Sequence, residues 1–190
     1  MPTIFDRQAK PRKGSLLLAE PFMDDPNFRR GVVMLCEHDE TGTFGLMLNR
    51  PIDAVLGNVL PELAHFEAQL YYGGPCRTET MHYLHRYGKL IDDCVNLGNG
   101  VFWGGHFEQI KSYILSGDII PEGIRFFIGF AGWDGQQLNE ELKEHSWFVT
   151  ESAADYVFAD DSNELWRDIL RDMGGEYREI ANYPENPSLN

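Results

Sequence analysis

Two β-rich runs joined by a short turn constrain the fold of this chain more than any other feature of its sequence. Val32–Glu37 reads VVMLCE, the turn HDETG ends at Gly42, and Thr43–Leu48 returns as TFGLML. Apolar runs separated by a few polar residues and a glycine are typical of an antiparallel hairpin. We therefore expect antiparallel sheet in the N-terminal part of the chain.

Hydrophobic patterning predicts helices and further strands downstream. HFEQIKSYILSG has apolar residues at helical spacing and Gly117 where the helix ends. DSNELWRDILRDMGG repeats this pattern, with Asp161 or Ser162 as the N-cap and Gly174 after the last turn. A shorter helix is expected within AVLGNVLPEL, before Pro61. The other expected strands are Ser15–Ala19, Gln69–Tyr72, Met81–Arg86, Val101–Trp103 and Ile124–Ala131.

The order of these elements, hairpins first and then strands alternating with helices, predicts an α+β (mixed α/β) fold with helices packed on a mixed sheet. A chain of 190 residues is expected to form one domain. We place it at residues 14–180, between an N-terminal arm (1–13) that is expected to be mobile and a polar, proline-rich C-terminal tail (181–190) that is expected to be loose. No apolar run approaches the about 20 residues of a membrane span, so the cytoplasm is the expected location.

The net charge of −14 is unevenly distributed. Residues 1–90 carry 10 Lys/Arg against 11 Asp/Glu, whereas residues 91–190 carry 6 against 19. An acidic half repels nucleic-acid phosphates and lacks the basic stripe that they require, so direct DNA binding is disfavoured. The acidity accounts for solubility before it indicates any partner.

The stretch GFAGWDGQQLNEEL resembles a glycine-rich turn that opens a helix, but it lacks the spacings that cradle phosphates. Asp134 is expected to be the N-cap, with Gln137 three residues later as in a capping box, and Leu138 and Leu142 packing the helix down. An N-terminus that already holds a carboxylate is a poor phosphate site. Trp133 either packs into the core or forms one wall of a shallow pocket.

The histidines and cysteines do not form a recognisable catalytic or metal site. His82 and His85 are spaced HxxH, but in a strand this spacing places them on opposite faces. Glu37, His38 and Asp39 enter a turn, where polar residues are usually solvated. The three cysteines form no CxxC pair, and a disulfide framework is not expected. We assign no catalytic residue, metal or cofactor.

Three motifs with special backbone requirements remain: LNRP (Asn49–Pro51), YYGGPC (Tyr71–Cys76) and AGWDGQ (Ala131–Gln136). Each follows or ends an expected strand, where binding sites often form. Arg50 is the cation best placed to hold an anionic group. The alternative is that these motifs only turn the chain and that Arg50 pairs with a nearby acid.

The same motifs carry a family resemblance. With GSLLLAEPFM, an LCEH strand end, GLMLNRP, YxGGP and GFAGWDGQQLNEE in this order, the chain resembles the bacterial YqgE/AlgH family from about Gly14 to about Gly174. Two departures stand out. The segment CRTETMHYLH stands where the family usually has an RGFVLH strand: His85 matches its terminal histidine, but the Arg-Gly pair has no match. GTFGLMLNRP replaces the usual GAMGLVINRP.

The resemblance implies a bifurcated, mixed and largely antiparallel sheet folded into a pseudo-barrel, with helices outside. It implies little about activity: the family is largely uncharacterised, has a proposed role in regulating transcription of a polysaccharide pathway, and has no established catalytic residues or cofactor. The candidate ligand-binding residues are Asn49, Arg50, Gly73, Gly74, Pro75, His85, Trp133 and Gln136.

Three functional hypotheses follow. The first is a non-enzymatic binding or regulatory protein that uses the strand-end surface for an unidentified protein or small-molecule partner. The second is an enzyme in which His85 or His38 acts as a base beside Arg50, which requires both groups to share a pocket. Direct DNA binding is the third and least favoured.

Overall fold

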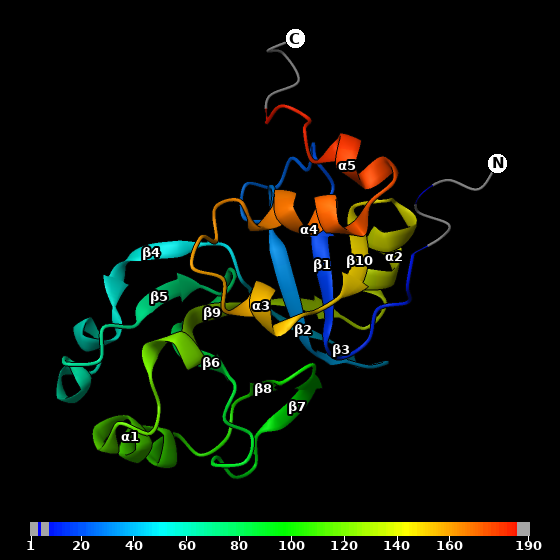
Figure 1. Cartoon of the computed structure of the whole chain (residues 1–190). Helices are drawn as coiled ribbons and strands as arrows, with labels where there is room; N and C mark the ends of the chain where they lie inside the picture. Colours follow the sequence, from blue (N-terminus) through cyan, green and yellow to red (C-terminus); the bar gives the residue numbers. More distant parts are fainter. Residues whose placement is uncertain (1–3, 5–7, 186–190) are drawn as a thin grey trace.

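The computed structural model describes Ile4 and residues 8–185, which form a curled sheet covered by helices (Figure 1). The strands run in the order β10 (Trp147–Glu151), β1 (Ser15–Ala19), β2 (Val32–His38), β3 (Gly42–Met47), β9 (Ile124–Asp134), β6 (Cys76–His85), β8 (Val101–Trp103) and β7 (Val95–Gly98). Off this path, β4 (Pro51–Val55) pairs with β5 (Gln69–Tyr72), which also pairs with β9. The helices are α1 (Phe107–Ser116), α2 (Gln137–Lys143), α3 (Ala154–Val157), α4 (Leu165–Met173) and α5 (Glu176–Ile180).

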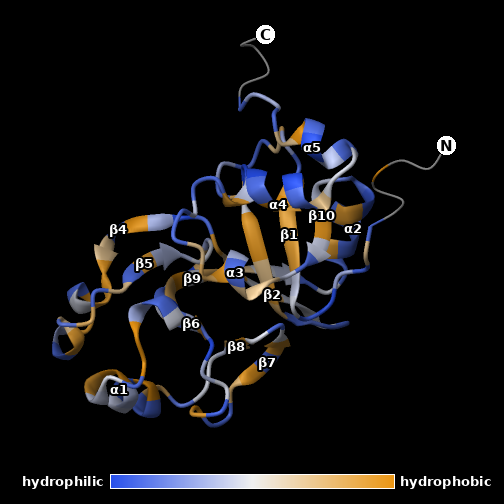
Figure 2. Ribbon diagram, in the orientation of Figure 1, coloured by the Kyte–Doolittle hydropathy of each residue, from blue (hydrophilic) through white to orange (hydrophobic). Residues whose placement is uncertain are grey.

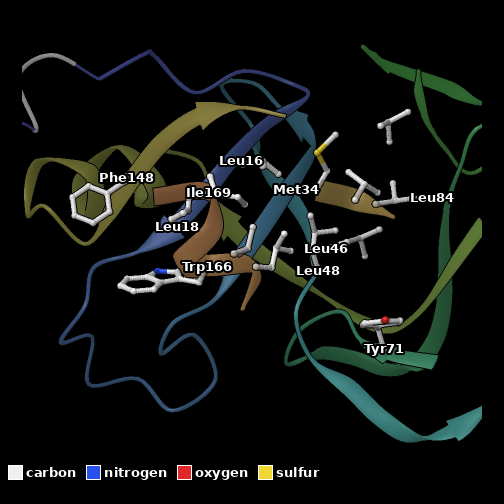
Figure 3. Close-up of a cluster of buried hydrophobic side chains, with 14 of the residues drawn as sticks. Leu16, Leu18, Met34, Leu46, Leu48, Tyr71, Leu84, Phe148, Trp166 and Ile169 are labelled. Atoms are coloured by element: carbon white, nitrogen blue, oxygen red, sulfur yellow. The ribbon is translucent and has the colours of Figure 1, made fainter. Parts of the chain in front are cut away.

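The strands β1, β2 and β3 are buried on both faces because alternate side chains enter two different cores. Leu16, Leu18 and Met34 face α4, whose Trp166 and Ile169 pack against them (Figure 3). Leu17, Val33 and Met47 face the opposite core with Trp133, Trp147 and Leu138. This double burial explains why the sequences SLLLA and VVMLC are continuously apolar, as their orange colour in Figure 2 shows.

Strand β9 joins the two parts of the sheet. Its first half lies between β5, the partner in parallel orientation, and β6. Its last residues, Ala131–Asp134, pair instead with Gly42–Gly45 of β3. One edge of β9 is thus divided between β5 and β3, and the sheet is bifurcated, mixed and largely antiparallel. The sheet curls into a half-barrel, so the expected α+β class is confirmed.

A separate core fills the end of the molecule that carries β4, β5 and α1. Ile110 and Ile114 of α1 pack against Phe126 of β9 and Leu63. In Figure 1, α1 and the β4–β5 arm lie away from α4 and α5. No helix in the described part of the chain combines the length and apolar character needed to cross a membrane.

The predicted hairpin, α1 with its terminal Gly117, and the other predicted strands are confirmed in position, with shifts at their ends that are largest at β6, which begins at Cys76 and not at Met81. Two helix starts were wrong. The helix α2 follows Gln136, and Asp134 is the last residue of β9, so Asp134 is not an N-cap. One half of the expected box is present, since the Asp134 N–H donates to Gln137 Oε1 at 3.2 Å.

The start of α4 was also wrong. It begins at Leu165 after Glu164, whereas Asp161 accepts a hydrogen bond from the Asn163 N–H in a turn before the helix. The short helix expected before Pro61 is two separate 3₁₀ turns, Leu56–Asn58 and Pro61–Leu63. The strands β4 and β7 and the helices α3 and α5 were not predicted, because each is short.

Both chain ends contact the domain where they are described. The Val149 N–H donates to Gln8 Oε1 at 2.8 Å, and Arg12 pairs with Glu151 at 2.7 Å. At the other end, Ala181 is buried and the Tyr183 carbonyl accepts a hydrogen bond from Arg30. The remaining parts of the arm and tail, residues 1–3, 5–7 and 186–190, lie outside the described residues.

Gly129, in the interior of β9, has no room for a side chain. It has φ +70°, and a Cβ there would lie 2.5 Å from the Gly74 carbonyl oxygen and 2.9 Å from the Cys76 carbonyl oxygen. Because both contacting groups are backbone, Gly129→Ala is expected to lower the free energy of unfolding by about 3 kcal/mol or more.

The matched control is Gly98→Ala, since Gly98 has φ +90° with open space around its Cβ position. It should cost about 1 kcal/mol, the conformational penalty alone. Urea unfolding of both variants measures the difference. Equal losses would show that close packing at Gly129 is not a constraint.

Candidate functional site

Asn49 connects the end of β3 to the start of β2. Its Oδ1 accepts a hydrogen bond from the Val32 N–H at 2.9 Å, and its Nδ2 donates to the Arg30 carbonyl at 2.8 Å. The Val32 N–H and the Arg30 carbonyl are buried main-chain groups, and the Asn49 side-chain amide supplies the hydrogen-bond partners that a neighbouring strand would otherwise provide. Asn49 is therefore a positioning residue: it holds the backbone of Arg30 close to Arg50, the residue that follows Asn49 in the chain.

Arg50 is half-buried and is held by main-chain carbonyls. Its Nη1 donates to the Asn49 carbonyl at 3.1 Å, and its Nη2 donates to the Arg29 carbonyl. No ion pair to Arg50 occurs within the described residues, so the expected alternative of a nearby acid partner is not what holds the side chain. Burial lowers the pKa of the guanidinium from its usual value. The positive charge is fixed in place without being neutralised.

Arg30 contributes a second guanidinium that is almost fully buried, with 9% of the residue exposed. Its Cζ lies 4.2 Å from the centre of the Trp166 ring, and its Nη2 donates to the Tyr183 carbonyl at 2.6 Å. Nε and Nη1 have no hydrogen-bond partner within the described structure. Burial, and then the charge of Arg167, lower the pKa of Arg30, whereas Glu185 acts in the opposite direction.

These arginines border an open cleft of about 210 Å³ between the start of β2, the β3–β4 connection and the approach to α4. Asn163 and the carboxylate-bearing Glu185 complete its lining, which is Arg29, Arg30, Asn49, Arg50, Asn163 and Glu185. Guanidinium groups form paired, charge-assisted hydrogen bonds with carboxylate and phosphate oxygens. The cleft, called the arginine cleft below, is therefore chemically suited to an anionic group.

Arg29 and Arg30 were missed by the sequence reasoning. The hairpin itself carried a usable signal: Val33 pairs with Met47, and continuing this antiparallel register backwards places Arg30 opposite Arg50. Arg29 and Arg30, just before β2, thus lie close to Arg50, just after its partner strand β3.

The YYGG motif adjoins Arg50 through its backbone. The Tyr72 N–H donates to the Arg50 carbonyl and the Met47 N–H to the Gly73 carbonyl, at 2.8 and 2.9 Å. A Cβ on Gly73 would lie 2.2 Å from the Gly129 oxygen, and one on Gly74 would lie 2.2 Å from the Phe130 carbonyl carbon. Both glycines therefore permit the close approach to β9, and Pro75 follows them as an exposed residue.

Trp133 and Gln136 do not join this group. Trp133 pairs with Thr43 at the opposite end of β3, roughly 20 Å along the strand from Asn49. Trp133 is a core residue, 4% exposed, and its Nε1 donates to Glu141 Oε2 at 2.8 Å, as does Nε1 of Trp147. This resolves the two alternatives left open for Trp133 in favour of the core. Gln136 is exposed and accepts a hydrogen bond from Asn139.

His85 is fully buried and both of its ring nitrogens are bonded. Nδ1 accepts from the Tyr87 N–H at 3.1 Å, which places the proton on Nε2, and Nε2 donates to the Gly104 carbonyl at 2.9 Å. Burial lowers the pKa of His85, partly offset by the Gly104 hydrogen bond. The ring is thus a neutral structural group.

His38 lies at the far end of β2 from Val32, where its Nδ1 contacts Thr43 Oγ1 at 2.7 Å. Neither His38 nor His85 lines the arginine cleft. The shared pocket required by the enzyme hypothesis is therefore not formed. His82 and His85 lie on one strand, as predicted, and the described residues contain no group of three or more His, Cys, Asp or Glu placed to hold a metal ion.

Comparisons with known proteins agree with this architecture. A family model described as AlgH-like matches residues 16–178. A UPF0301 protein of Chlorobium limicola is 40% identical over 181 residues, covering 95% of this chain and 97% of that protein. One from Cytophaga hutchinsonii is 38% identical over 179 residues, covering 94% and 98%.

Solved structures show the same fold. The solution structure of the AlgH protein from Pseudomonas aeruginosa has a TM-score of 0.71 at 28% identity and covers 94% of this chain and 98% of that one. A crystal structure of a protein from Corynebacterium diphtheriae has a TM-score of 0.80 at 26% identity, with coverage of 93% and 95%. The chain belongs to the AlgH-like family.

The position of Trp133 predicts a stability effect. Trp133→Ala should lower the free energy of unfolding by about 3 to 5 kcal/mol, because it opens a cavity between Phe28 and Trp147 and removes one donor to Glu141. Gln136→Ala, at an exposed position in the same motif, should stay within about 0.5 kcal/mol of wild type. Urea denaturation of the two variants distinguishes a core tryptophan from a pocket wall, for which both losses would be small.

The burial of His85 predicts a pH dependence. A histidine whose folded-state pKa is lowered stabilises the fold above its unfolded pKa of about 6.5, and this contribution is lost as the pH falls towards the folded value. His82, whose pKa is also lowered by burial, acts in the same direction. The urea concentration at the unfolding midpoint should therefore decrease as the pH is lowered from about 7.5 to about 5.5, and the decrease should be smaller in His85→Gln.

The control is His65→Gln, an exposed histidine that should leave the wild-type slope unchanged. An identical slope in wild type and His85→Gln would contradict the assignment of His85 as a buried neutral ring.

Proposed function

We propose that this protein is a non-enzymatic binding protein that holds an anionic group of a small molecule or partner protein in the arginine cleft, and that this binding serves a regulatory role in the bacterial cytoplasm. The observation that carries the proposal is Arg30: a nearly buried guanidinium with two nitrogen atoms, Nε and Nη1, that have no hydrogen-bond partner in the described structure. Arg30 lines the cleft together with Arg29 and Arg50, and guanidinium groups gathered in this way form charge-assisted hydrogen bonds with oxygen anions.

The charge distribution supports this reading. The chain has a net charge of −14, yet Arg29, Arg30 and Arg50 gather at one cleft and form no ion pair within the described residues. Arg167 lies close enough to lower the pKa of Arg30 and is itself paired with Glu164 at 3.1 Å. A local positive potential on an acidic protein attracts anions selectively to that place.

The cleft favours binding over chemistry. Among the described residues, its lining has no histidine, cysteine, serine or threonine that would act as a nucleophile or a general base. Glu185 is the carboxylate that the described part of the chain contributes to the lining. Regulation through a protein or small ligand also agrees with the acidic composition, which disfavours contact with DNA itself.

Isothermal titration with pyrophosphate at low salt tests the proposal. Wild type should bind, and Arg50→Ala and Arg29→Ala should each weaken binding about tenfold or more, the effect of one charge-assisted hydrogen bond. Arg29 is exposed, so its variant keeps the fold even if Arg50→Ala loses the two carbonyl contacts that order the loop.

The matched control is Arg171→Ala, whose guanidinium pairs with Asp168 on the surface of α4. It removes the same charge and should bind as wild type does. The proposal fails if wild type binds none of phosphate, pyrophosphate and citrate, or if Arg171→Ala weakens binding as much as Arg29→Ala does.

A further inference from the structure

The last residues of β9 leave one strand edge without a neighbour in the described structure. From Ile124 to Phe130 this edge is paired with β6, but the pairing stops where Cys76 meets Phe130. Beyond that point β9 continues for four residues, Ala131–Asp134, whose other edge is covered by β3. The open edge is thus a short, preformed stretch of extended backbone on a rigid sheet.

The hydrogen bonds around Gly42 show which groups this edge presents. The Gly42 carbonyl accepts from the Asp39 N–H at 3.0 Å, so the polar groups of Gly42 face away from β9. Gly42 and its register partner Asp134 are therefore a pair without mutual hydrogen bonds. The Asp134 N–H faces the open edge, where it meets Gln137 Oε1, and Gly132, two residues earlier, presents its N–H and C=O to the same edge.

A groove of about 510 Å³ runs along this edge. Glu37, Phe44 and Gly132 are register partners across β2, β3 and β9, so they share one face of the sheet. Gly132 has no side chain in this row, and the stacked rings of Phe44 and Phe130, 4.5 Å apart, form the apolar floor beside it. The groove thus combines free backbone groups with an aromatic surface.

The charged residues of the groove are mainly acidic. Glu37, Asp39 and Asp134 supply three carboxylates against one cation, Arg77. Hydrogen bonds from Thr41 lower the pKa of Asp39, which keeps this carboxylate ionised. The groove is complementary to a segment that carries positive charge.

We propose that this groove binds an extended segment of a partner protein in which basic and apolar residues alternate, and that the segment adds to the sheet as a strand along the open edge of β9. Backbone hydrogen bonds to Gly132 align the strand, since strand addition uses free main-chain groups of this kind. Basic side chains on the face of the strand turned towards the groove lay their aliphatic stems on Phe44 and Phe130 and reach the carboxylates of Glu37, Asp39 and Asp134 with their charged ends, because these residues share one face of the sheet.

This surface is independent of the arginine cleft. The cleft lies beside Asn49, after the end of β3, whereas the groove lies beside Gly42–Phe44 at its start. Loss of anion binding in an Arg29 variant therefore leaves the groove intact, and the two proposals fail or succeed separately.

The probe is a fluorescein-labelled, blocked heptapeptide, KVKTKVK, measured by fluorescence anisotropy at low salt. Wild type should bind it, and the amide signal of Gly132 should shift in a ¹⁵N spectrum. An EVETEVE peptide should not bind. KVKTKVK methylated at alternate backbone nitrogens should lose binding, because it keeps the charge but has no donors for strand pairing.

Two variants test the groove from the protein side. Glu37→Gln combined with Asp134→Asn should weaken binding about tenfold, and Glu108→Gln combined with Glu176→Gln, two exposed carboxylates outside the groove, should not. Gly132→Val should abolish binding by filling the row beside Phe44. Its Cβ would meet the far end of the Phe130 ring at 3.2 Å and Cys76 Sγ at 3.7 Å, so the strand accepts it with a small ring shift.

Several results would overturn the proposal. Equal binding of the acidic or the methylated peptide would show that charge or strand pairing is not used. Unshifted Gly132 signals would place the peptide elsewhere. Self-association of the wild type that Gly132→Val removes, without peptide binding, would assign the open edge to a second copy of this chain.

Discussion

The backbone contact between β9 and the segment that precedes β6 determines how this sheet is built. At Gly129, β9 adopts φ +70° and passes within contact distance of the carbonyls of Gly74 and Cys76. Gly73 also contacts β9, because its N–H donates a hydrogen bond to the Ile128 carbonyl. Only chains without side chains at these points approach so closely. The bend lets one strand belong first to the β5–β6 part of the sheet and then to the β3 part, which produces the bifurcation.

This geometry places two different surfaces at the two ends of β3. Where β3 ends, the chain leaves the sheet through Asn49 and Arg50 while β9 is occupied by β5, and the arginine side chains gather beside the junction. Where β3 begins, β9 has passed the last pair with β6 and one of its edges is open. The first surface is cationic and the second is mainly anionic.

Much of the fold was predictable because it depends on local patterns: the hairpin, the buried strands and the two longest helices follow from hydrophobic spacing and terminal glycines. The errors lie where long-range contacts decide. Asp134 has the residue type and spacing of an N-cap, but pairing with Gly42 extends β9 through it. Trp133 and Arg50 belong to motifs that both follow or end an expected strand, and only the register of β3 shows that they lie near its opposite ends. Arg30 escaped notice because its importance comes from Trp166, which lies 136 positions further along the chain.

The arrangement of Arg30 is difficult to explain by stability alone. Each buried donor without a partner costs about 1 to 3 kcal/mol, and Arg30 has two. The contact of its charge with the Trp166 ring stabilises the fold by about 2 kcal/mol, and its charge-assisted hydrogen bond to the Tyr183 carbonyl by about 1.5 to 3 kcal/mol. Arg30 also has φ +55°, a conformation that costs a non-glycine residue about 1 kcal/mol or more. Asn49 nevertheless holds the Arg30 carbonyl through a hydrogen bond. Arg50 is held beside it by two main-chain carbonyls, which do not neutralise its positive charge. In the proposed function, an anion in the cleft offsets part of this cost by pairing with the charges of Arg29, Arg30 and Arg50, which favours a binding site over a purely structural device.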